Sequence, residues 1–100
     1  MNEKVLECIY AAVDEANEQR AGEPPIAKEP ATPIHGGGSE LDSLGLINFV
    51  VAVEENVERE LGVVVVLGDD RAIDHDPSPF GSIAALAAYV ELLLAEQTAA

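Results

Sequence analysis

A serine at the expected start of a long helix is the residue of this 100-residue chain whose setting best suits chemistry. Ser43 stands between Asp42 and Leu44, and Gly36–Gly38 lie a few residues upstream. The first turn of a helix carries unpaired backbone N–H groups and the positive end of the helix dipole, so it favours a bound phosphate. This setting suits a phosphate group near Ser43. The simpler alternative is that the Ser43 hydroxyl or the Asp42 carboxylate only caps the helix.

The same serine does not have the surroundings of a catalytic nucleophile. The nucleophile elbow of hydrolases needs glycine two residues before and two residues after the serine, but Leu41 and Gly45 occupy these positions. The bases on offer, His35 and His75, both fall in predicted loops. The sequence therefore does not predict a serine hydrolase, and we expect a protein that is not itself an enzyme.

Other polar clusters do not match a known metal or nucleotide site. The acidic segment 69–76 lacks the central glycine and the terminal glutamate of an EF-hand loop, so we expect no dedicated metal site, although weak cation binding there stays open. Gly36–Gly38 is not followed by the lysine of a phosphate-binding P-loop. The single cysteine, Cys8, excludes an internal disulfide and is predicted to be a core residue.

The overall charge restricts the classes of partner. Nineteen acidic residues against five basic ones give a net charge of −14, which repels nucleic acids and anionic membranes and favours partners with basic patches. An acidic surface that only keeps the protein soluble is the alternative. We find no apolar run long enough to span a bilayer, and residues 1–3 lack the basic start of a signal peptide. We expect one domain, residues 1–100, located in the cytoplasm.

Apolar periodicity predicts a first helix at about residues 2–20, with Asn2 as its cap and with Arg20 and Gly22 at its end. Its buried stripe is predicted to comprise Val5, Leu6, Ile9, Tyr10 and Val13. Residues 21–42 follow, with four of the six prolines, and are predicted to form a long loop. Two isoleucines are expected to attach this loop to the helices, namely Ile26 and Ile34.

The second helix is predicted at about residues 43–61, with Gly62 as its end. Its buried face is predicted to comprise Leu46, Phe49, Val50, Val53 and Val57. Leu44, Ile47 and Val51 fall on a different face, which predicts an exposed apolar strip and a candidate contact site.

Residues 62–81 are predicted to form a loop with one short helix. Residues 63–67 have the composition of a strand, but no second strand is available to pair with them, so we expect an extended loop packed on the core. Residues 69–74 are the expected short helical turn, and Ser82 is expected to cap a last helix at about 82–96. The inward residues of that helix are predicted to be Ile83, Leu86, Tyr89, Val90 and Leu93. Together these elements predict an all-α fold, a three- to four-helix bundle, up–down with a long first loop.

A small, acidic, all-helical chain with Asp42-Ser43-Leu44 at a loop–helix junction resembles the acyl carrier proteins, with the specific match confined to residues 41–57. The resemblance implies an acyl-carrier-like bundle in which Ser43 carries 4′-phosphopantetheine, transferred from coenzyme A by a phosphopantetheinyl transferase. The thiol of that group would hold acyl intermediates as thioesters for acyl-activating, condensing or acyl-transfer enzymes. The resemblance therefore implies a monomeric carrier.

In that family the second helix is the main recognition surface. Carried onto this chain, the surface comprises Asp42, Leu44, Ile47, Val51, Glu54 and Glu55. Gly45 and Asn48 stand where carriers of fatty-acid synthesis usually have acidic residues, and segment 63–79 is longer than usual. These departures indicate a specialised, stand-alone carrier for a lipid, polyketide or envelope pathway.

Two alternatives stay open. The cargo of a carrier could be aminoacyl or peptidyl, including D-alanyl, instead of a fatty or polyketide-type acyl group. A different class of protein is an unmodified helical module that binds a protein partner through Leu44, Ile47 and Val51. Addition of a phosphopantetheine group separates the carriers from this module.

Overall fold

The computed structural model describes residues 3–19, 25–35, 43–68 and 78–98, together with Gly22, Leu41 and Asp74. In this part of the chain the helices are α1 (Glu3–Glu18), α2 (Ser43–Leu61) and α4 (Ile83–Thr98), and there is no strand. The expected all-α class is therefore confirmed for the described residues. Three predicted features lie outside them: the Asn2 cap, Arg20, and the short helix at 69–74 apart from Asp74.

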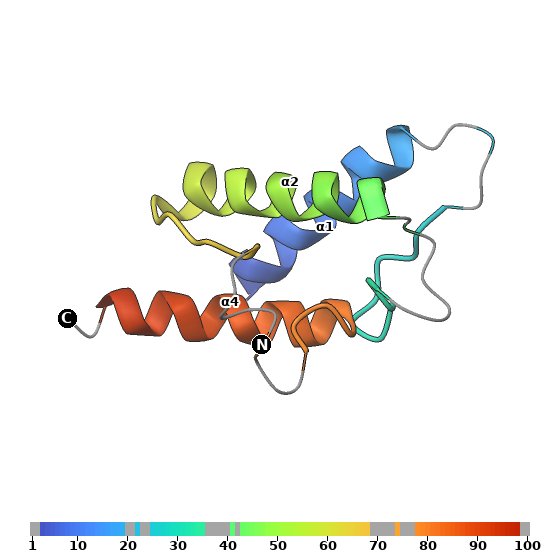
Figure 1. The fold of residues 1–100 in the computed structure, drawn as a ribbon. Coiled ribbons are helices and arrows are strands. Elements are labelled where there is room, and N and C mark those ends of the chain that lie inside the picture. The colour runs from blue at the N-terminus through green and yellow to red at the C-terminus, as the bar shows by residue number, and fades with distance from the viewer. Residues whose placement is uncertain are drawn as a thin grey trace.

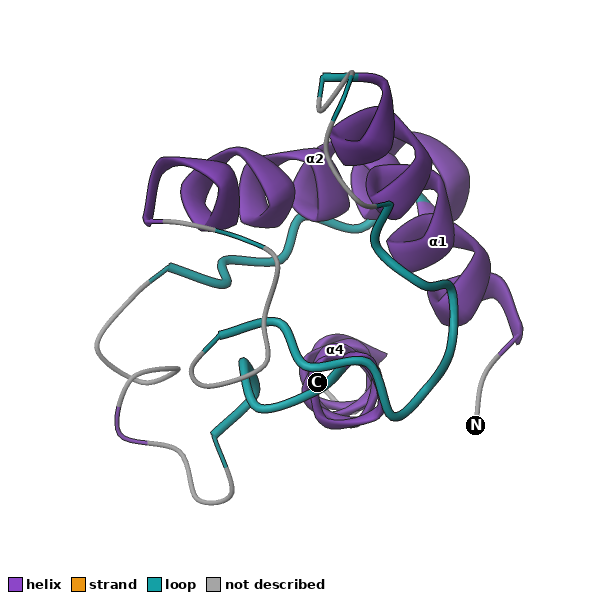
Figure 2. Ribbon diagram, turned by 90° about the vertical axis from the view of Figure 1, so that its right-hand side faces the viewer, coloured by secondary structure: helices purple, strands orange, loops and turns teal. Residues whose placement is uncertain are grey.

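Helices α1 and α2 form one packed pair, and α4 lies across from them (Figure 1). The two helices of the pair run in roughly opposite directions and cross at an angle (Figure 1 and Figure 2), and α1 also packs on α4. Helix α2 is inclined to α4, which Figure 2 shows nearly end-on. Loop segments run through the space between the pair and α4 (Figure 2), so loops as well as helices close the core.

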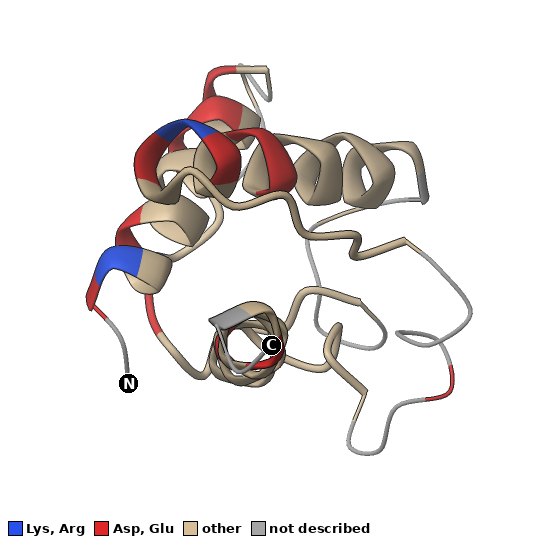
Figure 3. Cartoon of the chain, turned by 90° about the vertical axis from the view of Figure 1, so that its left-hand side faces the viewer, with Lys and Arg blue, Asp and Glu red and all other residues tan. Residues whose placement is uncertain are grey.

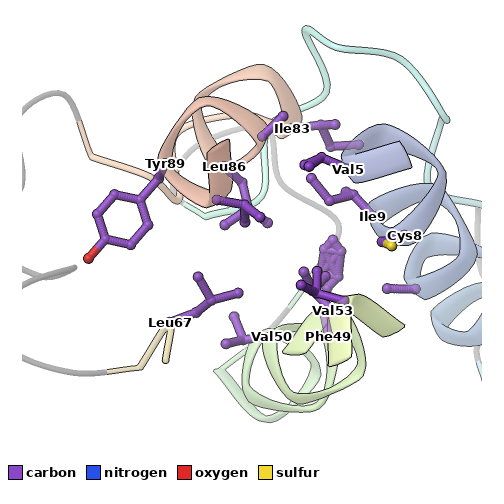
Figure 4. Close-up of a cluster of buried hydrophobic side chains, with 14 of the residues drawn as sticks. Val5, Cys8, Ile9, Phe49, Val50, Val53, Leu67, Ile83, Leu86 and Tyr89 are labelled. Atoms are coloured by element: carbon purple, nitrogen blue, oxygen red, sulfur yellow. The ribbon is translucent and has the colours of Figure 1, made fainter. Parts of the chain in front are cut away.

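The core contains the residues that the helical periodicity predicts. Its buried apolar side chains from the three helices include Val5, Cys8, Ile9, Val13, Phe49, Val50, Val53, Val57, Ile83, Leu86, Tyr89, Val90 and Leu93 (Figure 4). Three further predicted core residues, Leu6, Tyr10 and Leu46, are half-buried and pack against this cluster. The hydrophobic faces inferred from the sequence are therefore the faces that the helices bury.

Part of the long first loop is built into the fold. Ile26 and Ile34 are both buried, as predicted. The Asn17 side chain at the end of α1 holds Ile26 at both polar groups of its backbone: the Ile26 N–H donates to Asn17 Oδ1 at 2.7 Å, and Asn17 Nδ2 donates to the Ile26 carbonyl at 3.1 Å. Residues 25–35 thus form an ordered connection despite having no helix or strand.

The first backbone N–H groups of α4 are satisfied by the segments that precede the helix. The acceptors are the Thr32 carbonyl for Ile83 at 3.0 Å, the Pro30 carbonyl for Ala84 at 2.8 Å and the Ser82 hydroxyl for Ala85 at 3.1 Å. Ser82 is therefore the predicted cap, and the helix itself begins one residue later. This helix start has its donors occupied by protein groups.

Segment 63–67 is an extended loop on the core, as predicted. Val65 and Leu67 are buried, whereas Val64 and Val66 are exposed. Side chains from both flanking helices hold its backbone. The Leu67 N–H donates to a Glu54 carboxylate oxygen at 2.7 Å, and the Gln97 side-chain amide donates to the Val64 carbonyl at 2.7 Å.

Candidate functional site

Helix α2 begins at Ser43, the residue singled out by the sequence. Its bounds, Ser43–Leu61, are those predicted. The helix ends because Gly62 adopts a left-handed conformation with φ +69°, and its N–H donates to the Glu58 carbonyl at 2.9 Å. The Ser43 side chain and Asp42 lie outside the described part of the chain, so the site is built from the helix that follows them.

The charges of α2 are confined to its C-terminal half. Residues 43–53 contain no ionisable side chain, whereas residues 54–60 include four glutamates and Arg59. Figure 3 shows the uncharged half in tan and the acidic half in red. The first turn therefore holds no carboxylate that would offset the positive end of the dipole, and Arg59 in the last turn matches the negative end. This distribution favours an anionic group at the start of α2.

The apolar strip predicted on α2 is exposed. Leu44, Ile47 and Val51 have 67%, 59% and 44% of their surface accessible, and we call these three residues the α2 strip. Burial of large apolar side chains is favourable, so three of them on one open face of a helix offer a contact surface for another molecule. The strip starts one residue after Ser43.

The two glutamates predicted to act in recognition have different surroundings. Glu55 is exposed, as a recognition residue must be. Glu54 is half-buried, and its carboxylate accepts the hydrogen bond from the Leu67 backbone. Glu54 therefore has a structural contact with segment 63–67 that the sequence did not indicate.

A buried polar cluster between α1 and α2 was missed by sequence reasoning. Asn56 is 2% exposed, and its side-chain amide donates to the Cys8 carbonyl at 3.0 Å and to a Glu15 carboxylate oxygen at 3.3 Å. Arg59 donates to Asn56 Oδ1 at 2.8 Å, and the Cys8 thiol lies 3.6 Å from the Asn56 carbonyl. Asn56 lies three residues after Val53 and seven after Phe49, so its spacing was the available signal for burial.

A groove of about 220 Å³ lies between the C-terminal half of α1 and the first half of α2. We call it the α1–α2 groove. Its lining comprises Ala12, Glu15, Ala16 and Gln19 of α1, Leu41, and Leu44, Gly45, Asn48, Phe49 and Ala52 of α2. Leu44 belongs to both the groove and the α2 strip, so the two features share an edge next to the start of α2.

The other candidate groups that the sequence offers are Cys8, His35 and His75. Burial raises the pKa of the Cys8 thiol, which keeps it protonated and unreactive at neutral pH. His35 is an exposed loop residue whose backbone N–H donates to the Phe80 carbonyl at 2.9 Å, and His75 lies outside the described residues.

Two searches of the described residues bear on the class of protein. Within ranges 3–19, 25–35, 43–68 and 78–98, no three His, Cys, Asp or Glu side chains gather where they could hold a metal ion, and most of the acidic segment 69–76 lies outside these ranges. None of the helices in the described part of the chain is both long enough and apolar enough to cross a bilayer.

Comparisons with known protein families, with curated proteins and with solved structures find no match to this chain.

Proposed function

We propose that this protein is an acyl carrier whose Ser43 bears 4′-phosphopantetheine. One observation carries the proposal: Ser43 opens a 19-residue helix, and the residues directly after it leave an apolar strip exposed. A carrier needs an attachment point at an accessible helix start and a nearby face on which partner enzymes can dock. Helix α2 begins at Ser43, and it exposes the α2 strip within its first three turns.

The residues at the start of α2 suit a phosphodiester. The first turn has the positive end of the helix dipole and no carboxylate, so a negative group gains a favourable interaction there. Gly45, which has no side chain, lines the α1–α2 groove. The bound group supplies a terminal thiol that holds the cargo as a thioester, and the protein supplies attachment, orientation and docking.

The carrier acts by tethering. An acyl group fixed to the protein meets each docked active site at a high effective concentration, because the second encounter becomes intramolecular. The α2 strip selects the enzymes that dock, and the acidic residues at 54–60 attract basic patches beside their active sites. We expect this association to slow as ionic strength rises.

The partners in this proposal are a phosphopantetheinyl transferase and enzymes that activate, condense or transfer the acyl group. Because Gly45 and Asn48 are uncharged, the early part of α2 differs from that of the general fatty-acid carriers, so we propose a specialised lipid, polyketide or envelope pathway. An aminoacyl or D-alanyl cargo is an alternative within the same carrier class.

One observation favours a second class of function. The exposure of the α2 strip does not depend on modification of Ser43. An unmodified helical module that binds a partner through Leu44, Ile47 and Val51 is therefore the competing proposal.

The experiment that separates these proposals is the intact mass of the protein after incubation with coenzyme A, Mg²⁺ and a phosphopantetheinyl transferase of broad specificity. We expect the mass of one added phosphopantetheine group. Ser43→Ala should abolish the addition, and Ser39→Ala, which removes the next hydroxyl upstream, should leave it intact.

Circular dichroism of Ser43→Ala checks that the helices persist, because loss of a helix cap costs only about 1 kcal/mol. Modification of Ser43→Ala at another residue would refute the assignment of Ser43. An unchanged mass of the wild-type protein with several transferases would favour the unmodified binding module.

A further inference from the structure

The α1–α2 groove extends to the start of α2, next to Ser43 in the chain. Leu44 and Gly45, the two residues after Ser43, line one end of the groove, and Ala52 lines the other. From Gly45 to Ala52 the groove follows α2 for about 10 Å at 1.5 Å per residue. Residues of the C-terminal half of α1, from Ala12 to Gln19, line the groove together with the first half of α2.

Small residues keep this groove open. Ala16 of α1 faces Gly45 and Ala52 of α2 across it, and the Phe49 side chain, which is buried, supplies an apolar floor. Any larger side chain at these small positions would fill the space between the helices.

The other flank of α2 is filled by protein side chains. Leu67 and Val50 pack together there, opposite Leu86 of α4, and all three are buried (Figure 4). A flexible chain that starts at Ser43 therefore finds a preformed recess on the α1 side and a packed core on the α4 side.

The polar lining indicates which kind of chain fits. Three polar side chains border the groove, namely Glu15, Gln19 and Asn48. Two amides and a carboxylate match a chain that carries amide and hydroxyl groups, because each can pair with a hydrogen-bonding group of the ligand. A hydrocarbon tail would leave these three groups without partners from the ligand, which is unfavourable if they lose water.

We propose that the α1–α2 groove holds the pantetheine arm itself, with its amide groups against Gln19 and Asn48 and its methyl groups over Phe49. This inference rests on the proposed attachment at Ser43, and it assigns the groove to the arm and not to the acyl cargo. The arm then has a resting place on the carrier between its visits to partner enzymes.

The test compares backbone amide chemical shifts of the apo and holo proteins, the holo form being made with coenzyme A and a transferase and verified by mass. Leu44 and Gly45 are too close to the new covalent bond to be informative. We expect shifts at Ala16, Asn48 and Ala52, and unchanged amides at Leu86 and Val90 of α4. Shifts confined to α4 and segment 63–67, or to the residues next to Ser43, would overturn the proposal.

Matched variants test whether these chemical-shift changes depend on the groove. Ala16→Leu fills it from α1, whereas Ala11→Leu makes the same change at another half-buried position of α1 that does not line it. Once loaded, Ala16→Leu should lose the shifts at Asn48 and Ala52, and Ala11→Leu should keep them. Asn48→Ala, at an exposed position, should weaken the shift at Ala16 and serves if Ala16→Leu does not fold.

The outcomes separate this inference from the proposed function. Absence of added mass contradicts attachment at Ser43. Added mass without shifts in the groove, or with shifts that survive Ala16→Leu, contradicts only the resting place of the arm.

Discussion

Helices α2 and α4 use their apolar residues in opposite ways. Helix α4 is the more apolar of the two in sequence, yet Leu92, at 38% exposure, is its most exposed large hydrophobic side chain within the described residues. Its other outward apolar positions include the small residues Ala88 and Ala95. Helix α2 instead places Leu44 and Ile47 outward, each more than half exposed.

The difference shows that the α2 strip is not a by-product of a hydrophobic composition. In α4, apart from Leu92, small apolar residues face solvent and large ones pack toward the core, which is the arrangement that stabilises a folded monomer. In α2, large residues face both ways, and the outward ones do not contribute their full burial energy in the isolated chain. A helix that presents such residues beside a candidate attachment point is suited to binding another molecule.

The largest expected effect comes from α4. Leu86 is fully buried, so Leu86→Ala should destabilise the protein by about 3 kcal/mol through lost burial and the cavity left behind. Urea denaturation followed by circular dichroism measures this change. If Leu86→Ala costs no more than a surface substitution, α4 is not part of the core and the contrast between the two helices fails.

The polar cluster between α1 and α2 gives the next effect. Asn56→Ala removes the side-chain contacts with Cys8, Glu15 and Arg59, and should lower the free energy of unfolding by about 2 kcal/mol. Asn48→Ala, an exposed amide on the same helix, is the control and should stay within about 0.5 kcal/mol of wild type. Equal effects of the two variants would contradict the structural role of Asn56.

The start of α4 gives a smaller effect. Ser82→Ala removes the hydroxyl that accepts the Ala85 N–H and should cost about 1 kcal/mol. The control is Ser78→Ala, because the Ser78 hydroxyl accepts a longer bond, 3.3 Å from the exposed Phe80 N–H. Thermal unfolding should rank Ser82→Ala below Ser78→Ala, and the reverse order would show that Ser82 does not act as the cap.

The smallest effect on stability is expected on the α2 strip. Ile47 is 59% exposed, so Ile47→Glu should change the free energy of unfolding by no more than about 0.5 kcal/mol. Transfer of an acyl group to a partner enzyme should nevertheless be impaired, because a carboxylate replaces an apolar contact. Loss of helicity in Ile47→Glu would show that Ile47 belongs to the core, and would remove the contrast between α2 and α4.

Local patterns predicted most of the helical architecture. The bounds of α2 follow from the apolar spacing before Gly62, and the buried face of α4 follows from Ile83, Leu86 and Val90 at helical spacing. The first helix was predicted to reach residue 20, but it ends at Glu18, where the Gln19 N–H bonds to the Ala16 carbonyl at 3.2 Å and tightens the last turn. The position of a helix end depends on single hydrogen bonds of this kind, which the apolar pattern of the sequence does not indicate.

Contacts between distant segments could not be predicted in this way. The carboxylate of Glu54 binds the backbone of Leu67, a contact that depends on how segment 63–67 crosses the core. The α1–α2 groove depends on which small residues the packing of α1 against α2 brings together, such as Ala16 and Gly45. For the candidate site, the sequence placed Ser43 at the start of α2 but gave no indication of the recess beside it.

The bonds from Pro30 and Thr32 to the start of α4 have a consequence for the order in which the protein folds. These acceptors precede their donors, Ala84 and Ile83, by about fifty residues, and closing so long a loop is entropically costly. We therefore expect the first turn of α4 to be completed late, after Asn17 of α1 has fixed Ile26 in the segment at 25–35. The backbone amide hydrogens of Ile83 and Ala84 should then exchange with solvent at the rate at which segment 25–35 detaches from α4. Their exchange therefore reports the opening of a segment about fifty residues earlier in the chain.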